Sequence, residues 1–183
     1  MAAPQKPFGF TLIELMITIV VLVILVTLAA PAFNLAEQRR VIGAAESALD
    51  QIQMARTEAI KQGRDIRFVS QVDGDAWCHG ITSTPACDCT VEDPAAANAC
   101  TIVMAGDEDA VLRTTSSDDY RNVSMTGEQT VTFNHVRGTV QGDRSDLLFT
   151  SSPNNFGMQV QINPIGRPRA CGTNRAMGAY SEC

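Results

Sequence analysis

The segment Gly9–Phe33, GFTLIELMITIVVLVILVTLAAPAF, most constrains what this chain can become. Its residues Leu15–Ala30 form a run of sixteen without charge. An apolar helix over residues 10–33 is long enough to cross about 30 Å of hydrocarbon. One carboxylate, Glu14, interrupts its beginning, and a charge inside a membrane costs on the order of a few kcal/mol. The sequence therefore predicts a membrane-seeking helix whose glutamate needs a compensating partner.

Two kinds of processing fit this segment. An ordinary secretory signal would use Lys6 as its positive start and Ala29–Ala32 as its cleavage site, but it gives no reason for Glu14. Cleavage between Gly9 and Phe10 gives one, because the new α-amino group lies four residues before the glutamate and such residues share one helix face. The two charges can then compensate each other within one chain or between neighbouring chains. The leader with its lysine would stay on the cytoplasmic side.

A helical pattern continues after Pro31, because apolar residues recur at steps of three or four over residues 34–63. Pro31 is predicted to disturb the helix, and Gly63 is predicted to end it. We expect the helix beyond residue 33 to pack on a sheet through an apolar stripe. The stripe consists of Leu35, Ile42, Ala45, Leu49, Ile52, Ala55 or Arg56, and Ala59 or Ile60.

Strands and turns are predicted for the remainder, residues 64–183, which is rich in Gly, Asn, Asp, Ser and Thr. Alternating apolar and polar residues predict strands at 65–70, 130–134 and 157–163, with weaker candidates at 100–105 and 110–115. The predicted fold class is α+β, with a long N-terminal helix packed on a sandwich-like antiparallel β-sheet domain.

The cysteines predict a disulfide-stapled domain, because an even number beyond an export segment is typical of an oxidising compartment. Cys171 and Cys183 are the easiest local pair and would tether the tail. Cys87 and Cys89 are so close in sequence that each is expected to bond elsewhere. The pairing stays open among 15 connectivities. The competing interpretation is a zinc site, although the spacing matches no two-knuckle pattern. The disulfide candidates are Cys78, Cys87, Cys89, Cys100, Cys171 and Cys183, and the zinc candidates are Cys78, His79, Cys87, Cys89 and Cys100.

Charge is unevenly distributed along a chain whose formal net charge is −6. Residues 73–119 hold ten acidic residues and one basic residue, Arg113. Residues 137–175 hold five arginines against Asp143 and Asp146. This asymmetry indicates either two surfaces of opposite sign or simply solvated loops.

No constellation typical of an enzyme appears in the sequence. His79 and His135 are far apart and are expected at the surface or in turns. A Gly-rich phosphate loop, an HExxH motif and a nucleophile elbow are all missing. We therefore predict a protein that is not an enzyme and has no cofactor and no bound metal.

The motif GFTLIEL at Gly9–Leu15 resembles the class III signal of type IV pilins and type II secretion pseudopilins. The resemblance implies cleavage after Gly9 by a prepilin peptidase, N-methylation of Phe10, and a role for Glu14 in assembly with other major and minor pilins. It implies a single-pass inner-membrane precursor with a periplasmic C-terminal domain, later assembled into an extracellular pilus or a periplasmic pseudopilus. The expected parts are a leader at 1–9, a polymerisation helix at 10–33, its amphipathic continuation at 34–63 and the β domain at 64–183.

Four internal fragments narrow the resemblance to the GspH/FimT group of minor pilins and pseudopilins. MARTEAIKQG resembles that group's helix end, DAWCHG its tryptophan–glycine turn, VTFNHVRG its phenylalanine strand followed by glycine, and INPIGRPR its closing strand. They occupy residues 54–63, 75–80, 131–138 and 162–169. The cysteine-rich insertion Cys78–Cys100 departs from the group, and the sequence assigns it no function.

Arginines near the C-terminus are the candidate binding residues. Arg167 and Arg169 are two apart, so that an extended segment points them to one side, and Pro168 suits the edge of a sheet. Guanidinium groups bind phosphate oxygens, and without a base-reading element such binding is independent of sequence and sensitive to salt. Arg175, in a loop that a Cys171–Cys183 bond would tether, extends the set by proximity in the sequence.

The segment Gly166-Arg167-Pro168-Arg169 also matches the GRxR motif of the FimT branch. That resemblance implies a minor pilin whose motif, Gly166, Arg167 and Arg169 here, contacts double-stranded DNA during natural transformation. The alternative is a structural, priming minor pilin or an H-type pseudopilin that binds other minor subunits. The arginines would then meet acidic partners, or would bond Asp143 or Asp146 within the chain. A third interpretation is a secreted enzyme whose signal is cleaved near Ala32.

Overall fold

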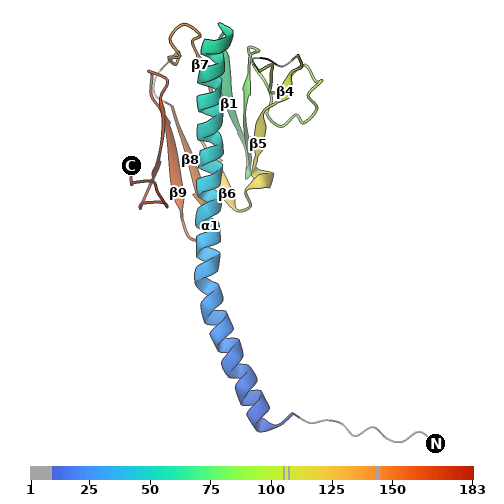
Figure 1. Cartoon of the computed structure of the whole chain (residues 1–183), viewed down its shortest axis with the longest axis vertical. Coiled ribbons are helices and arrows are strands. Elements are labelled where there is room, and N and C mark those ends of the chain that lie inside the picture. The colour runs from blue at the N-terminus through green and yellow to red at the C-terminus, as the bar shows by residue number, and fades with distance from the viewer. Residues whose placement is uncertain (1–9, 105, 107, 143–144) are drawn as a thin grey trace, which may run out of the picture. The chain divides into compact units, whose positions relative to one another are not determined.

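The computed structural model describes residues 10–104, 106, 108–142 and 145–183, and only the backbone of residues 28–32 (Figure 1). The chain divides into two compact units, Met1–Ala36 and Glu37–Cys183. One helix, α1 at Leu12–Gln62, contributes to both. The predicted leader, residues 1–9 with Gly9, lies outside the described residues.

Large apolar side chains of the first unit are exposed from Phe10 to Val26. The helical backbone continues through Pro31. Among the residues whose side chains are described, no helix combines the length and the apolar character needed to cross a membrane.

In the second unit, α1 packs through a face made mostly of alanine. Its buried residues are Val41, Ala44, Ala45, Ala48, Ile52, Ala55 and Ala59. Such short side chains let strands approach the helix closely. Gly63, with φ of 62°, follows the last helical residue, as predicted. The stripe is wrong at Leu35, which is exposed. Of the alternatives Ala59 and Ile60, Ala59 is buried and Ile60 is exposed.

The β domain contains two four-stranded antiparallel sheets. The first has the order β5-β2-β1-β7 and the second the order β10-β9-β8-β6. The first sheet comprises β1 Ile66–Asp73, β2 Ala76–Thr82, β5 Thr114–Ser116 and β7 Gln129–Phe133; the second comprises β6 Val123–Thr126, β8 Ser145–Ser151, β9 Gly157–Ile162 and β10 Pro168–Gly172; β3 Thr101–Ile102 pairs with β4 Val111–Leu112, and the 3-10 helix η1 is Ser117–Asp119.

The predicted strands at 65–70, 130–134 and 157–163 are confirmed as β1, β7 and β9. The fragment 75–80, which resembled a turn, is instead largely strand β2. β2 is buried from Trp77 to Thr82, because residues of α1 cover one of its faces and the disulfide-linked loop that follows it, residues 83–100, covers the other. A strand buried on both faces shows no alternation in its sequence. β6 and β8 were also not predicted, and the expected closing strand at 162–169 is the end of β9, a turn and the start of β10.

One hydrophobic core joins α1 to both sheets, and Figure 1 shows the helix in front of the strands, running roughly along them. Trp77 on β2 connects the sheets, because its indole Nε1 donates to the carbonyl of Val123 on β6 at 2.7 Å. His79 also lies in this core, fully buried, so the expectation of a surface or turn position is wrong for it. Its Nδ1 lies 2.9 Å from Gln51 Oε1, and its Nε2 lies 3.3 Å from Ser47 Oγ.

The insertion Cys78–Cys100 folds over the outer face of β1 and β2. Disulfides join Cys78 to Cys89 and Cys87 to Cys100, so Cys87 and Cys89 each bond elsewhere, as predicted. These four residues form a second small core with Val69. Because the sulfur atoms bond each other, the zinc interpretation is wrong.

Candidate functional site

Two turns lie side by side at one end of the β domain. The turn 134–138 follows β7, and the turn 163–167 joins β9 to β10. Each is closed by a backbone hydrogen bond of 2.8 Å, from Gly138 N to Asn134 O and from Gly166 N to Asn163 O. Val140 N donates to Pro164 O at 2.9 Å and connects the two segments. We call residues 134–138 and 163–167 the paired turns.

Glycine is required where the paired turns touch. Gly166 has φ of 76°, and a Cβ added to it would lie 1.9 Å from the carbonyl oxygen of Gly138. The same oxygen accepts a hydrogen bond of 3.0 Å from Arg56 Nε of α1. Three fragments that resembled the family separately, 54–63, 131–138 and 162–169, therefore meet here. The structure gives Gly166 a packing role as well as the predicted turn.

Arg167 and Arg169 are both exposed beside the paired turns. Arg167 ends the second turn, and Arg169 lies on β10 opposite Gln161 of β9. Pro168 is the first residue of β10, an edge strand of the second sheet, as its ring predicted. Among the described residues, neither guanidinium group makes a hydrogen bond or an ion pair.

Asp146, one of the two predicted carboxylate partners, lies in the same cross-strand row as Arg169, because both are opposite Gln161 of β9. One strand separates them, and the Asp146 carboxylate accepts a hydrogen bond of 3.1 Å from Gln159 Nε2. Asp143 lies outside the described residues.

Arg175 lies at the other end of the second sheet. Its Nη2 donates to Asn154 O at 3.1 Å, and its guanidinium carbon lies 4.7 Å from the centroid of the Phe156 ring. Phe156 immediately precedes β9, whereas Arg169 pairs with Gln161 of the same strand, so roughly 17 Å of strand separates the two positions. The structure does not bring Arg175 together with Arg167 and Arg169.

The C-terminal tail is tethered as predicted. Cys171 and Cys183 form a disulfide. Gly172 N donates to Ser181 O, and Cys183 N donates to Gly172 O, both at 2.9 Å. The tail is therefore fastened to the end of β10, away from the paired turns.

Arg137 is a further exposed arginine at this site that the sequence did not single out. It precedes Gly138 in the first of the paired turns, and its place in the fragment VTFNHVRG was the available signal. His135 of the same turn binds Asp65 through its backbone N–H, 3.0 Å from Oδ1, and through its ring Nδ1, 2.7 Å from Oδ1. These bonds, the side-chain bond first, lower the pKa of Asp65.

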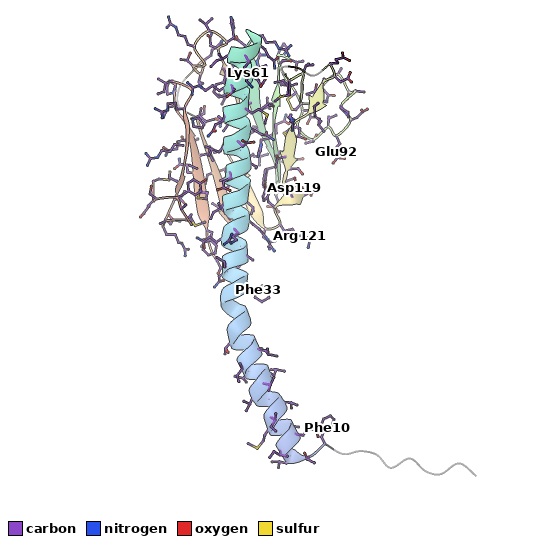
Figure 2. The ribbon with its side chains drawn as sticks, in the orientation of Figure 1. Phe10, Phe33, Lys61, Glu92, Asp119 and Arg121 are labelled. Atoms are coloured by element: carbon purple, nitrogen blue, oxygen red, sulfur yellow. A yellow bond between two sulfur atoms is a disulfide. The ribbon has the colours of Figure 1, made fainter. Side chains whose placement is uncertain are left out.

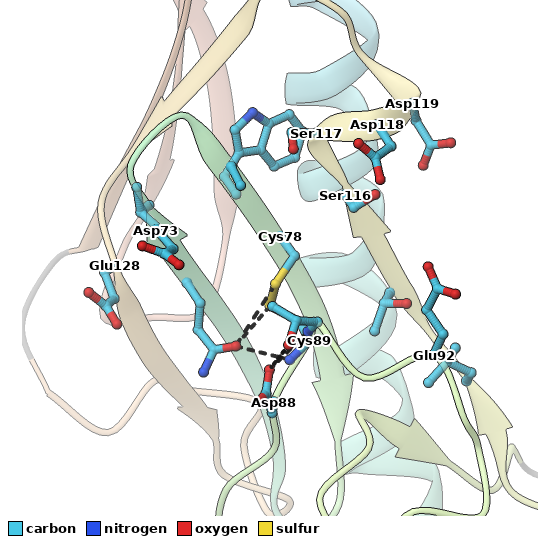
Figure 3. A pocket seen from close by; sticks show the side chains of 17 residues that line it. Asp73, Cys78, Asp88, Cys89, Glu92, Ser116, Ser117, Asp118, Asp119 and Glu128 are labelled. Carbon is cyan, nitrogen blue, oxygen red and sulfur yellow. Dashed lines mark hydrogen bonds between the residues drawn. A yellow bond between two sulfur atoms is a disulfide. The ribbon is translucent and has the colours of Figure 1, made fainter.

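Acidic residues gather in a pocket of about 840 Å³ on the outer side of the first sheet (Figure 3). Gln71 lies on its wall and accepts a hydrogen bond of 3.0 Å from Cys89 N. The pocket thus lies along β1, β2 and the adjoining loops, whereas Arg167 and Arg169 lie at and beside β10 of the second sheet. The carboxylates that line the pocket are Asp73, Asp88, Glu92, Asp118, Asp119 and Glu128.

Glu14 has a local role at the start of α1. Its backbone N–H donates to Thr11 Oγ1 at 3.3 Å, and the sequence Thr11-Leu12-Ile13-Glu14 has the spacing of a capping box. A carboxylate in the first helical turn also interacts favourably with the helix dipole. The cap is Thr11, and within the described residues the Glu14 carboxylate itself makes no hydrogen bond.

Comparison with known proteins places the chain in a family. Residues 44–166 match the family model of the type II transport protein GspH, and residues 5–30 match the prokaryotic N-terminal methylation motif. The GspH match ends at Gly166, so Arg167 and Arg169 lie beyond it. No curated protein matches the chain.

Two crystal structures of the type IV minor pilin FimU from Pseudomonas aeruginosa strain PAO1 are similar to this one. Both have 19% sequence identity to the chain and are covered over 96% of their own length. They cover 75% and 72% of this chain, with TM-scores of 0.46 and 0.41. Because the GspH match spans more than half of the 183 residues, the chain belongs to the family of type II transport protein GspH and carries the N-terminal methylation motif of pilin-like proteins.

Proposed function

We propose that the chain is a minor type IV pilin, incorporated in or at the tip of a pilus, that binds extracellular double-stranded DNA for uptake in natural transformation. The observation that carries the proposal is the pair of exposed guanidinium groups of Arg167 and Arg169 beside a turn fixed by Gly166. No enzymatic activity is part of this proposal.

The arginines suit phosphate because their donors are not used by the described part of the chain. A guanidinium group can bind phosphate through two parallel hydrogen bonds, which are stronger than bonds between neutral groups. The described structure presents no helix or ribbon with base-reading side chains at this end, so we expect contacts to phosphate alone. Such binding is independent of DNA sequence and weakens as salt rises.

The overall acidity of the chain opposes DNA binding, but its position limits the effect. The carboxylates of the acidic pocket lie along β1, β2, β5 and the adjoining loops, whereas Arg169 lies on β10 at the edge of the other sheet. At physiological ionic strength, repulsion between exposed charges is largely screened beyond about 8–10 Å. DNA that approaches the paired turns therefore experiences mainly the nearby arginines.

The N-terminal part supports assembly in this proposal. A prepilin peptidase cleaves after Gly9, Phe10 is N-methylated, and the new amino group offsets Glu14 of its own or a neighbouring chain. The exposed apolar side chains from Phe10 to Val26 are expected to be buried against lipid or another protein. The inner membrane buries them before assembly, while the domain from residue 64 on is periplasmic, and other major and minor pilins bury them in the fibre.

A second candidate function is a structural, priming minor pilin or an H-type pseudopilin. The exposed aliphatic side chains of Val136 and Ile165 at the paired turns favour it, since arginine next to apolar surface also suits a protein partner. In this case the arginines meet acidic groups of other minor subunits instead of phosphate.

The test uses the full chain in neutral detergent and two short duplexes of unrelated sequence. We expect the double variant Arg167→Gln and Arg169→Gln to lose affinity for both duplexes alike. Arg121→Gln is the matched control, because it removes an exposed positive charge away from the site. The paired turns contact Arg56 near the end of α1 that carries Lys61, whereas Arg121 lies at the other end of the domain from Lys61 (Figure 2). Equal binding by wild type and the double variant contradicts the site. A pull-down of other minor subunits that is lost in the double variant, without any DNA binding by wild type, supports the second function.

A further inference from the structure

We propose that Arg137 is a third phosphate-contacting residue, so that the DNA-binding surface is formed by the paired turns and the start of β10. This inference rests on the proposed function and deepens it. It moves the third contact from Arg175, at the far end of the second sheet, to a residue of a different strand connection.

The backbone contacts bring Arg137 and Arg167 together. Arg137 immediately precedes Gly138, and Arg167 immediately follows Gly166. The Gly138 carbonyl oxygen lies 1.9 Å from the position of a Cβ on Gly166, so the two arginines are each one peptide away from a direct contact of the two turns. Two exposed arginines so placed are near enough along the backbone for one duplex to reach both.

The contact between the turns is held rigidly enough to serve as a binding surface. The Arg56 side chain bonds the Gly138 oxygen at 3.0 Å, and the bond from Val140 N to Pro164 O fastens the segments a second time. A preformed arrangement of charges loses less freedom when a ligand binds. Arg56 thus supports the surface through its bond to Gly138.

The charges around Arg137 leave it available to a ligand. The side chain is exposed, and no hydrogen bond or ion pair of it occurs within the described residues. The described carboxylate bound to this turn, Asp65, is occupied by the backbone and ring of His135 and by Gln141 Nε2 at 3.2 Å. The paired turns themselves contain two arginines and no acidic residue.

Exposed aliphatic side chains at the same turns fit a protein partner better than DNA. Val136 is 71% and Ile165 is 57% exposed. The uncompensated arginines suit DNA, because phosphates can neutralise all three guanidinium groups at once. An acidic protein partner would also neutralise them, and the experiment below separates the two. We therefore expect Val136 and Ile165 to lie beside the bound duplex without contributing to its affinity.

The experiment measures the affinity of the full chain in neutral detergent for a short fluorescent duplex at several salt concentrations. We expect Arg137→Gln to weaken binding about three- to tenfold at low salt and to reduce the slope of log affinity against log salt by about 0.9. Arg121→Gln is the charge-matched control and should leave both quantities unchanged. Val136→Ser with Ile165→Ser should change the affinity less than about twofold.

The outcomes separate this inference from the proposed function. Should Arg137→Gln match Arg121→Gln while the Arg167→Gln, Arg169→Gln variant loses binding, the inference is overturned and the proposed function stands. Absence of DNA binding by the wild-type chain overturns both. Loss of a captured minor pilin by the Val136→Ser, Ile165→Ser variant, with DNA affinity unaffected by Arg137→Gln, assigns the surface to a protein and also overturns the inference. Thermal melting of each variant identifies losses that result from unfolding.

Discussion

The carbonyl oxygen of Gly138 lies 1.9 Å from the point that a Cβ of residue 166 would occupy. Two turns from distant parts of the sequence can meet this closely only because residue 166 is glycine. Arg56 of α1 bonds the same oxygen, so that the helix end, the turn after β7 and the β9–β10 turn share one contact. The exposed arginines Arg137 and Arg167 are positioned by it.

Substituting Gly166 by alanine should therefore disrupt this end of the domain. We expect Gly166→Ala to lower the free energy of unfolding by more than about 3 kcal/mol, because the methyl group meets a backbone atom that cannot rotate away. Gly74→Ala is the matched control: φ is 61° there as well, but no atom lies within 4 Å of the added Cβ, so only a backbone cost of about 1 kcal/mol remains.

Urea denaturation of residues 37–183 measures both values. This unit contains every side chain that forms the hydrophobic core. Equal destabilisation by the two substitutions would show that the paired turns separate easily and that their contact contributes little.

His79 should make the domain less stable in mild acid. Burial lowers the pKa of His79 to about 3, from an ordinary value of 6.5. The unfolded chain therefore takes up a proton below pH 6.5, whereas the folded chain takes it up only near pH 3. The contribution of His79 to the free energy of unfolding is therefore complete above pH 6.5. It falls as the pH falls, by up to about 1.4 kcal/mol per pH unit.

The free energy of unfolding between pH 6.5 and 5 isolates this effect from the carboxylates. There we expect a smaller pH slope for His79→Gln than for wild type, whatever the absolute stability of the variant. An identical slope in wild type and His79→Gln contradicts a neutral buried imidazole.

The Cys171–Cys183 disulfide should stabilise the tail without taking part in DNA binding. Its sequence separation is 12, so its removal by Cys171→Ser with Cys183→Ser should cost about 3 kcal/mol in the chain-entropy model. β10 remains paired with β9 over residues 168–172, and Arg167 and Arg169 keep their places. Titration with a fluorescent duplex should give an unchanged affinity; a loss comparable to that of the arginine variants would mean that the tail is part of the site.

Glu14 has two possible roles, and a conservative substitution separates them. Glutamine retains the side-chain acceptor of a capping box but carries no charge. We expect Glu14→Gln, like Glu14→Ala, to enter filaments poorly, because the amino group of Phe10 loses its charged partner. Incorporation is measured by immunoblotting sheared pili, with mass spectrometry of the mature N-terminus as the control for cleavage after Gly9. Normal incorporation of Glu14→Gln would leave helix capping as the sufficient reason for the glutamate.

Local patterns predicted much of the fold. Ala45, Ile52, Ala55 and Ala59 of the predicted stripe lie on the buried face of α1. The alternation around Phe68, Val131 and Val160 predicted the strands β1, β7 and β9. β2 was not predicted as a strand, because the disulfide-linked insertion buries its second face and removes the alternation of apolar and polar residues. Its burial depends on the Cys78–Cys89 and Cys87–Cys100 pairing, and the local sequence pattern does not specify that pairing.

The candidate site could be predicted only in part, because one of its residues is placed by a contact between distant parts of the chain. Arg167, Arg169 and the turn at Gly166 follow from a short motif. Arg137 joins them through the contact of Gly138 with Gly166, which is set by strand pairing across the two sheets. Arg175 is near Arg167 and Arg169 in sequence but far from them in space, because the rest of β10 runs between Arg169 and the loop that holds Arg175.

The most direct measurement of the central claim is the dependence of DNA affinity on salt concentration for the full chain and its Arg167→Gln, Arg169→Gln variant. With three phosphate contacts, the slope of log affinity against log salt should be about −2.7 for wild type and about −0.9 for the variant. The same two slopes should be obtained with duplexes of any sequence. A wild-type slope near zero, or one that the double substitution leaves unchanged, would contradict the account.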